Sequence, residues 1–408
     1  MTERLLYLDK IRPFIGKPLI KVLTGIRRCG KSTLMLQIID NLQREGVKPE
    51  HIIYINKELF EFDEIHDYKS LHTFVSSKSP GSRIKYYLFV DEVQEVEGWE
   101  RAISSLLAVK NYDIYLTGSN ANLLSSELAT LLSGRYVEFK MYPLTYPEFE
   151  QLGSENKKLP PDGDMFNSFL KYGGLPGIHL LDWDENAIRQ YLQSVYSTIL
   201  LKDVVVRYGI RDAALLERIV TFLADNCGNI TSSKSISDFL KSQRWKVSVD
   251  TVQNYIHYCQ RALLIEKVQR FDLKGRRILE ILEKYYISDV GIRYAIIGYS
   301  PEDLPGQLEN VVLLDLLAHG YQIFVGKQHE KEIDFIARKG NEKLYLQVCT
   351  TLADGKVIDR EYGALEGVSD HFPKYVLSLD RGFETSRKGI RWMNIKDFLH
   401  CSDKASLT

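Results

Sequence analysis

The sequence has few cysteines, no long apolar run and almost no net charge. Its five cysteines show no paired spacing, which excludes zinc ribbons and disulfide frameworks and suits a reducing cytoplasm. No segment approaches the roughly 20 apolar residues of a membrane helix, and the N-terminus does not read as a signal peptide. We therefore expect a soluble, cytoplasmic protein without a membrane partner.

A net charge of −1 on 408 residues excludes a chain basic enough to coat nucleic acid over its whole surface, although a local basic patch is compatible with it. The composition, 44% hydrophobic and 26% charged, is that of a globular protein, and the length fits two to four domains. A polar segment with paired prolines, residues 153–164, reads as a linker after the first domain.

What the sequence does contain is a complete phosphate-binding pattern. Residues 25–33 read GIRRCGKST and fill every fixed place of G-x-x-x-x-G-K-[ST]. The glycines let backbone N–H groups close round phosphate oxygens, Lys31 supplies a cation to the β- and γ-phosphates, and the Ser32 hydroxyl ligates Mg²⁺. We expect ATP and Mg²⁺ on this loop, whose residues are Gly25, Ile26, Arg27, Arg28, Cys29, Gly30, Lys31, Ser32 and Thr33.

The loop lies between a predicted strand and a predicted helix. Residues 19–24 form a short apolar run rich in β-branched residues, and residues 32–44 carry apolar side chains at helical spacing. The phosphates would therefore meet a helix N-terminus, where free N–H groups and the dipole favour negative charge. The alternative, a glycine turn before a surface helix, is disfavoured by this order of elements.

Two carboxylates follow a second predicted strand. The apolar run Tyr86–Val90 ends in Asp91 and Glu92, and the C-terminal tips of strands in an open α/β sheet are where ligands bind. Asp91 is predicted to hold Mg²⁺ and Glu92 to orient and polarise the attacking water. The alternative is that the pair merely caps the next helix.

A third predicted strand, residues 113–120, ends in small polar residues between the other two tips. We predict Ser119 to contact the γ-phosphate, with Asn120 as the alternative residue and an ordinary turn as the alternative role. A helix is expected over 121–132, followed by a strand over 136–142. Arg135 comes at the start of that strand, at the edge opposite the catalytic tips, so it is either a surface arginine or an arginine finger for a neighbouring subunit.

These parts, in this order, resemble the AAA+ ATPases. The Arg-Arg pair inside the loop and the Gly-Arg before the last core strand resemble one bacterial and archaeal group of them more closely. In the C-terminal half, YGGLPG at 172–177 and KYYISDVGIRYAI at 284–296 resemble the companion domain of unknown function that usually follows this ATPase. The resemblance spans nearly the whole chain.

The resemblance implies an α/β fold: a P-loop AAA+ core with a parallel sheet, a helical lid, a winged-helix domain and an α/β restriction-endonuclease-like domain. The corresponding boundaries are 1–152 for the core, 153–210 for linker and lid, 211–290 for the winged helix, and 291–408 for the nuclease-like domain of PD-(D/E)XK type.

The residues of the third segment also have winged-helix proportions. A first helix over 213–226 and a third, amphipathic helix around 249–263 precede two strands joined by a basic turn with Lys274, Arg276 and Arg277. A basic tip suits contact with DNA phosphates. The alternative is a tip that is basic for solubility, on a domain that binds protein or packs internally.

The last segment resembles a nuclease in layout. Glu309 is expected to begin a helix, Asp334 lies on one predicted strand and Gln347 on the next. Carboxylates there would hold Mg²⁺ and a lysine would assist water. However, Gln347 is a neutral ligand and Cys349 stands where the lysine belongs, so a degenerate site is predicted. Glu309 and Asp334 are alternatively ordinary helix-cap and strand-end charges.

Together these features predict an Mg²⁺-ATP-dependent ATPase with catalytic residues Glu92, Ser119 and Arg135. Because Arg135 points to a site shared between subunits, a homo-oligomer is expected. Beyond ATP, two partners remain open: double-stranded DNA, contacted through the basic tip, or a protein bound by a nucleotide-gated switch. ATP-dependent nuclease action is a third alternative.

Overall fold

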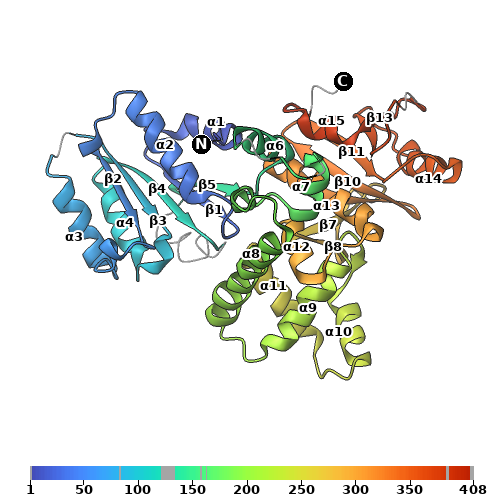
Figure 1. Ribbon diagram of the computed structural model, residues 1–408, viewed down its shortest axis with the longest axis horizontal. Helices are drawn as coiled ribbons and strands as arrows, with labels where there is room; N and C mark the ends of the chain where they lie inside the picture. Colours follow the sequence, from blue (N-terminus) through green and yellow to red (C-terminus); the bar gives the residue numbers. More distant parts are fainter. Residues whose placement is uncertain are drawn as a thin grey trace. The chain divides into compact units, whose positions relative to one another are not determined.

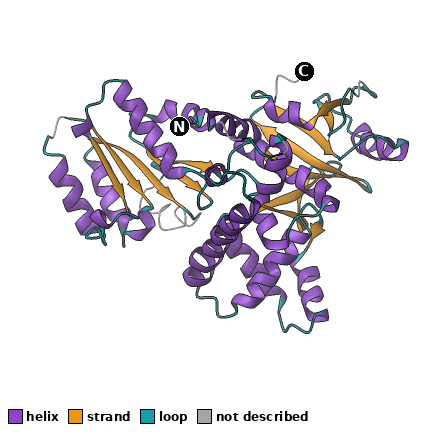
Figure 2. Cartoon of the chain, in the orientation of Figure 1, coloured by secondary structure: helices purple, strands orange, loops and turns teal. Residues whose placement is uncertain are grey.

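The computed structural model describes residues 2–81, 84–120, 134–156, 159–161, 163–382 and 386–404, with the backbone alone for residues 280 and 281. The chain divides into an N-terminal unit, Met1–Met141 with Arg261–Leu263, and a C-terminal unit, Tyr142–Gln260 with Leu264–Thr408. Each unit has its own β-sheet (Figure 2).

In the N-terminal unit the elements alternate between strands and helices (Figure 1). They are α1 (Leu5–Ile11), η1 (Arg12–Phe14), β1 (Ile20–Gly25), α2 (Lys31–Arg44), η2 (Pro49–His51), β2 (Ile52–Asn56), η3 (Phe60–Phe62), α3 (Tyr68–Lys78), β3 (Tyr86–Asp91), η4 (Val93–Glu95), α4 (Trp99–Ala108), β4 (Tyr112–Gly118) and β5 (Tyr136–Met141).

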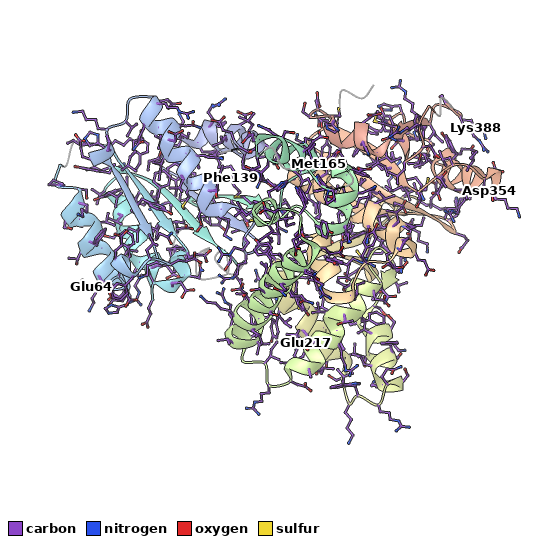
Figure 3. All side chains as sticks on the ribbon, viewed as in Figure 1. Glu64, Phe139, Met165, Glu217, Asp354 and Lys388 are labelled. Atoms are coloured by element: carbon purple, nitrogen blue, oxygen red, sulfur yellow. The ribbon has the colours of Figure 1, made fainter. Side chains whose placement is uncertain are left out.

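The sheet of this unit is parallel throughout, in the order β2-β3-β4-β1-β5. Every residue of β1 and β4 is buried, as is usual for the central strands of a parallel sheet covered on both faces. The chain crosses from β1 to β2 in one direction along the sheet and from β2 through β3 to β4 in the other, so the right-handed crossover rule predicts α2 on one face and α3 and α4 on the other. At the edge strand, Phe139, labelled in Figure 3, packs edge-on against Phe14 with 5.6 Å between ring centroids.

The predicted strands and the first helix agree with the observed ones to within about two residues. Because the strands are parallel, their C-terminal ends share one edge of the sheet, where Gly25, Asp91 and Gly118 end β1, β3 and β4. The helix expected over 121–132 lies outside the described residues.

A buried ion pair stabilises the sheet near the opposite edge. The Lys21 ammonium of β1 contacts the Asp113 carboxylate of β4, and both side chains are fully buried. Asp113 also accepts hydrogen bonds from the backbone N–H of Gly16 at 2.7 Å and the Tyr115 hydroxyl at 3.0 Å. Burial lowers the pKa of Lys21, although Asp113 opposes this shift. These contacts anchor the segment that precedes β1.

The C-terminal unit begins with helices and ends with a sheet. Its elements are α6 (Tyr146–Glu155), α7 (Met165–Tyr172), η6 (Pro176–Leu180), α8 (Glu185–Thr198), the π-helix η7 (Ile199–Val206), α9 (Ala213–Asp225), β6 (Ile230–Thr231), α10 (Ser233–Ser242), α11 (Val249–Arg261), β7 (Ile265–Asp272), β8 (Arg277–Ile287), α12 (Val290–Ile297), η8 (Pro301–Asp303), α13 (Leu304–Ala318), β9 (Gln322–Gln328), β10 (Lys331–Lys339), β11 (Glu342–Val348), α14 (Gly355–Glu366), β12 (Lys374–Ser378), β13 (Arg391–Asn394) and α15 (Ile395–His400).

One mixed sheet of eight strands runs through this unit, in the order β13-β12-β11-β10-β9-β7-β8-β6. The β7–β8 hairpin comes from segment 211–290, and β9 to β13 come from segment 291–408. They join because β9 pairs in parallel with the outer edge of β7, and Phe271 packs near Phe324 across that seam with centroids 5.9 Å apart. An edge strand is a ready template for such pairing.

The two motifs that resemble the companion domain pack against each other. Asp289 caps α12 through the N–H groups of Gly291 and Ile292 and also accepts a hydrogen bond from the Gly174 N–H at 2.7 Å. A Cβ at Gly291 would lie 1.9 Å from the Tyr172 carbonyl oxygen, so only glycine fits there. Burial raises the pKa of Asp289 to about 7. Both motifs therefore have a packing role.

None of the helices in the described part of the chain combines the length and apolarity that crossing a bilayer requires.

Candidate active site

The phosphate loop connects β1 to the first turn of α2. A Cβ on Gly25 would lie 2.7 Å from the Met141 carbonyl oxygen and 2.8 Å from the Cys29 sulfur, so the position accepts only glycine. Gly30 has φ +102°, a conformation that L side chains rarely adopt. The backbone thus turns sharply enough to point the N–H groups at the start of α2 toward a bound anion.

The Lys31 side chain lies inside this loop and is 4% exposed. Its ammonium donates hydrogen bonds to the carbonyl oxygens of Gly25 at 3.1 Å and Ile26 at 3.3 Å. The same nitrogen is 3.8 Å from a carboxylate oxygen of Glu92. Lys31, the predicted phosphate ligand, and Glu92, the predicted base, are therefore neighbours, as residues of one site must be.

Asp91 and Glu92 are both buried and are joined by Thr117 of β4. The Thr117 hydroxyl donates to Asp91 and accepts from the Glu92 backbone N–H, the latter at 2.8 Å. The second carboxylate oxygen of Asp91 accepts from the Tyr54 hydroxyl at 3.3 Å. One hydroxyl thus fixes the side chain of the predicted metal ligand and the backbone of the predicted base.

Glu92 has two signs of a functional position. Its φ is +53°, in the left-handed region, which is uncommon for a residue other than glycine and clusters at active sites. Burial tends to raise the pKa of its carboxyl, but the Lys31 ammonium and a hydrogen bond from Gln94 outweigh this and hold that pKa below its ordinary value. Glu92 is therefore ionised at neutral pH, as a base that orients water must be.

Ser119 and Asn120 are both fully buried just beyond β4. The Ser119 hydroxyl makes no hydrogen bond with a described residue, yet it is near enough to Glu92 to contribute, weakly, to lowering the pKa of that carboxyl. Ser119 thus lies buried beside Glu92, the predicted base.

Arg135 is exposed and directly precedes β5. Its carbonyl oxygen accepts a hydrogen bond from the Ile20 N–H at 2.9 Å, so it lies beside the first residue of β1. Gly25, where the loop starts, ends that strand. At a rise of about 3.3 Å per residue, Arg135 is roughly 17 Å along the sheet from the loop, and it is not part of its own chain's site.

The structure adds residues that the sequence analysis missed. Thr117 carried a signal, since it is two residues before Ser119 and alternate strand residues face the same side. Tyr54, Gln94 and Arg4 carried none. The Arg4 guanidinium donates to the Cys29 carbonyl oxygen at 3.1 Å and so braces the loop from the N-terminal segment.

The residues fit Mg²⁺ and a triphosphate. The cradle is one that any side chain at Gly25 would fill, and Ser119 offers an unpaired buried hydroxyl. Ser32, half-buried in the first turn of α2, and Asp91 supply oxygens, the donor type that Mg²⁺ prefers.

The basic residues Lys274, Arg276 and Arg277 lie, as predicted, at the tip between β7 and β8 and are exposed. The predicted nuclease-like residues are also brought together: Glu309, Asp334 and Gln347 line one cavity of about 600 Å³. Gln347 accepts a hydrogen bond from the Asp334 backbone N–H at 3.2 Å. The prediction that Glu309 begins a helix was wrong, because α13 starts one turn earlier, at Leu304.

An ammonium is present in this cavity region after all, supplied by Lys284 of β8. Its nitrogen is 2.8 Å from Glu332, 3.2 Å from Glu309 and 3.8 Å from Asp334, and its side chain is 3% exposed. Burial raises the pKa of both Asp334 and Glu309 while the ammonium opposes the shift. Glu309, Glu332 and Asp334 therefore surround a lysine that lies outside the local E-x-K pattern.

Among known proteins, the family described as AAA domain matches residues 17–150, and a domain of unknown function, DUF8612, matches residues 163–303. An uncharacterized protein of Haemophilus influenzae is 37% identical over 399 residues, 98% of each chain. The uncharacterized protein MJ1544 of Methanocaldococcus jannaschii is 31% identical over 363 residues, 85% of this chain and 78% of its own. The Walker-type ATPase PABY2304 of Pyrococcus abyssi, a solved structure, aligns with TM-score 0.49 and 18% identity over 72% of this chain and 96% of its own.

Proposed function

This chain belongs to one family with the Haemophilus influenzae protein and MJ1544, carries an AAA domain, and, we propose, is an AAA+ ATPase that hydrolyses Mg²⁺-ATP to drive a conformational change in a homo-oligomer. The observation that carries this proposal is the grouping of Lys31, Glu92 and Asp91 at one end of the parallel sheet, around a loop whose glycines cannot be replaced.

Each side chain has a distinct task in an in-line attack of water on the γ-phosphoryl group. Lys31 binds the β- and γ-phosphates and, in doing so, exchanges its loop carbonyl partners for phosphate oxygens. Glu92, ionised and held by Gln94, orients and polarises the water. Mg²⁺, held through Ser32 and Asp91, would neutralise charge on the phosphates. Ser119 contributes its free hydroxyl to the γ-phosphate.

The test is ATP binding and hydrolysis by Glu92→Gln and Lys31→Ala. Glu92→Gln keeps the shape and loses the base, so we expect bound ATP with turnover reduced at least about 100-fold. Lys31→Ala should lose nucleotide binding. The matched control is Glu97→Gln, an exposed carboxylate five residues further on. Hydrolysis by Glu92→Gln at the Glu97→Gln rate would show that another residue is the base.

We propose that residues 153–210 form the linker and helical lid, 211–290 a winged-helix domain and 291–408 a nuclease-like domain without nuclease activity. The order α9, β6, α10, α11 and the β7–β8 hairpin, with β6 paired to β8, supports the second. The neutralised carboxylates around Lys284 support the third. We further propose DNA as partner, contacted through the hairpin tip; a protein-binding switch is the alternative.

A further inference from the structure

A second open cavity of the C-terminal unit, about 410 Å³, lies between the hairpin tip and strands β10 and β11. Lys274 and Arg276 line it from the tip, Arg338 from β10 and Lys343 from β11. The one carboxylate in its lining is Asp370, just beyond α14. We call it the basic cleft. The whole chain has a net charge of −1, so four cations facing one carboxylate is a local surplus.

Within the basic cleft, the Arg338 side chain lies against two aromatic rings. Its guanidinium stacks over Phe271 at 4.4 Å and Phe324 at 5.5 Å from the ring centroids. Within the described part of the chain, its side chain makes no hydrogen bond or ion pair. A guanidinium over an aromatic ring keeps its fork of N–H donors, which can bind two oxygens at once.

The other cations of the basic cleft make few ion pairs with carboxylates of described residues. Lys274 and Arg276 are exposed and, among the described residues, neither pairs with a carboxylate. Lys343 is 2.8 Å from Asp370, but Asp370 is shared with the Tyr345 hydroxyl and lies 3.8 Å from the Lys374 ammonium. Asp370 thus already has three polar partners, and Lys274, Arg276 and Arg338 remain as a surplus of positive charge in the cleft.

We propose that the basic cleft binds the phosphate backbone of DNA, with Arg338 and Lys343 extending the contact made by the hairpin tip. A planar, stacked guanidinium suits phosphate, because the fork matches two phosphate oxygens. Lys274 and Arg276 from the hairpin tip and Arg338 and Lys343 from two further strands line the same cleft, so one DNA strand could meet cations from both sides. The inference rests on the proposed DNA contact of the tip, but not on ATP hydrolysis.

The test is binding of a fluorescein-labelled 20-base-pair duplex to the full chain by anisotropy, over a salt series without nucleotide. Arg338→Gln should weaken binding about tenfold at 100 mM salt and reduce the slope of log K against log salt by about 1. Arg276→Gln should do the same. Lys69→Gln, an exposed lysine of α3 with the same charge change, is the control and should bind as the unmodified chain does.

A gain-of-function variant makes the test independent of any folding defect in Arg338→Gln. Asp370→Asn removes the one carboxylate of the cleft and should tighten DNA binding about threefold. Loss in Arg276→Gln with no change in Arg338→Gln or Asp370→Asn would overturn the cleft and leave the tip contact standing. Absence of DNA binding by the unmodified chain would overturn both the cleft contact and the tip contact. Displacement of the DNA by polyglutamate at equal charge would instead identify an acidic protein as the ligand.

Discussion

At the scale of single residues, Thr117 holds the two carboxylates at the end of β3, Asp91 and Glu92, in place. Its hydroxyl has one proton, given to Asp91, and its oxygen accepts the Glu92 backbone N–H. Glu92 stands at φ +53°, where few contacts would otherwise hold an L residue. Thr117 therefore positions the proposed metal ligand, Asp91, and the proposed base, Glu92, together.

Thr117→Val removes both hydrogen bonds while keeping the shape of the side chain. Removing a hydrogen-bond partner that orients a metal ligand typically lowers metal affinity or activity about 10- to 100-fold. We expect kcat for ATP to fall by about that factor with little change in KM, and Thr117→Ser, which restores the hydroxyl, to recover most of the activity. Steady-state kinetics with ATP provides the check. A rise in KM at unchanged kcat would instead assign Thr117 to nucleotide binding.

The residues around this centre show what local sequence can predict. Gly25, Lys31, Asp91 and Glu92 lie within short patterns whose spacing is set by one loop or one strand end. Tyr54 reaches Asp91 from another strand, and a tyrosine within an apolar run has no mark that separates it from a core residue. Ser119 stays a prediction, now with a buried, unpartnered hydroxyl behind it.

At the scale of elements, the C-terminal sheet brings Lys284 of β8 against Glu309 of α13 and Asp334 of β10. The distance along the chain from Lys284 to Asp334 is 50 residues, and a pattern confined to β10 and β11 does not contain it. The strands themselves could be predicted from their apolar runs. Their pairing into one sheet through β7 and β9 could not, because register between distant strands leaves no local signal.

Lys284→Met should destabilise the protein strongly, since it leaves Glu309, Glu332 and Asp334 without a buried counter-charge. Breaking such a buried pair costs about 3–5 kcal/mol. The carboxyls are then protonated more easily, so the loss should be smaller at pH 5 than at pH 8. Urea unfolding at both pH values measures it.

The control for this change is Lys267→Met on the adjacent strand β7. The Lys267 ammonium is 2.7 Å from Glu283 but its side chain is 33% exposed, and surface pairs of this kind are worth about 0–1 kcal/mol. Equal destabilisation by both substitutions, or a larger loss at pH 5 than at pH 8 for Lys284→Met, would mean that the carboxylates do not depend on the lysine.

At the scale of the whole molecule, Arg135 lies at the end of its own sheet that is opposite the phosphate loop. Arg135 adjoins the start of β1, whereas the loop follows the end of that strand. Its side chain is exposed. In a ring or filament, the two ends of the unit on successive copies face each other, and a site that lacks a cation for the transferring phosphoryl group can receive it from the next copy.

Mixing two inactive variants tests this arrangement. Arg135→Ala keeps its loop but offers no finger, and we expect bound ATP with turnover reduced about 1,000-fold. Lys31→Ala lacks a working loop but keeps Arg135. In a mixed oligomer, Arg135 from the Lys31→Ala copy completes the site of the Arg135→Ala copy, so hydrolysis should reappear on mixing and rise with total protein concentration.

The control is Arg101→Ala, a change of an exposed arginine of α4, which should leave turnover unchanged. If the mixture stays as inactive as its parts while the two variants still co-assemble, Arg135 acts within its own chain or not at all, because subunits that share a site cannot fail to complement when each supplies what the other lacks.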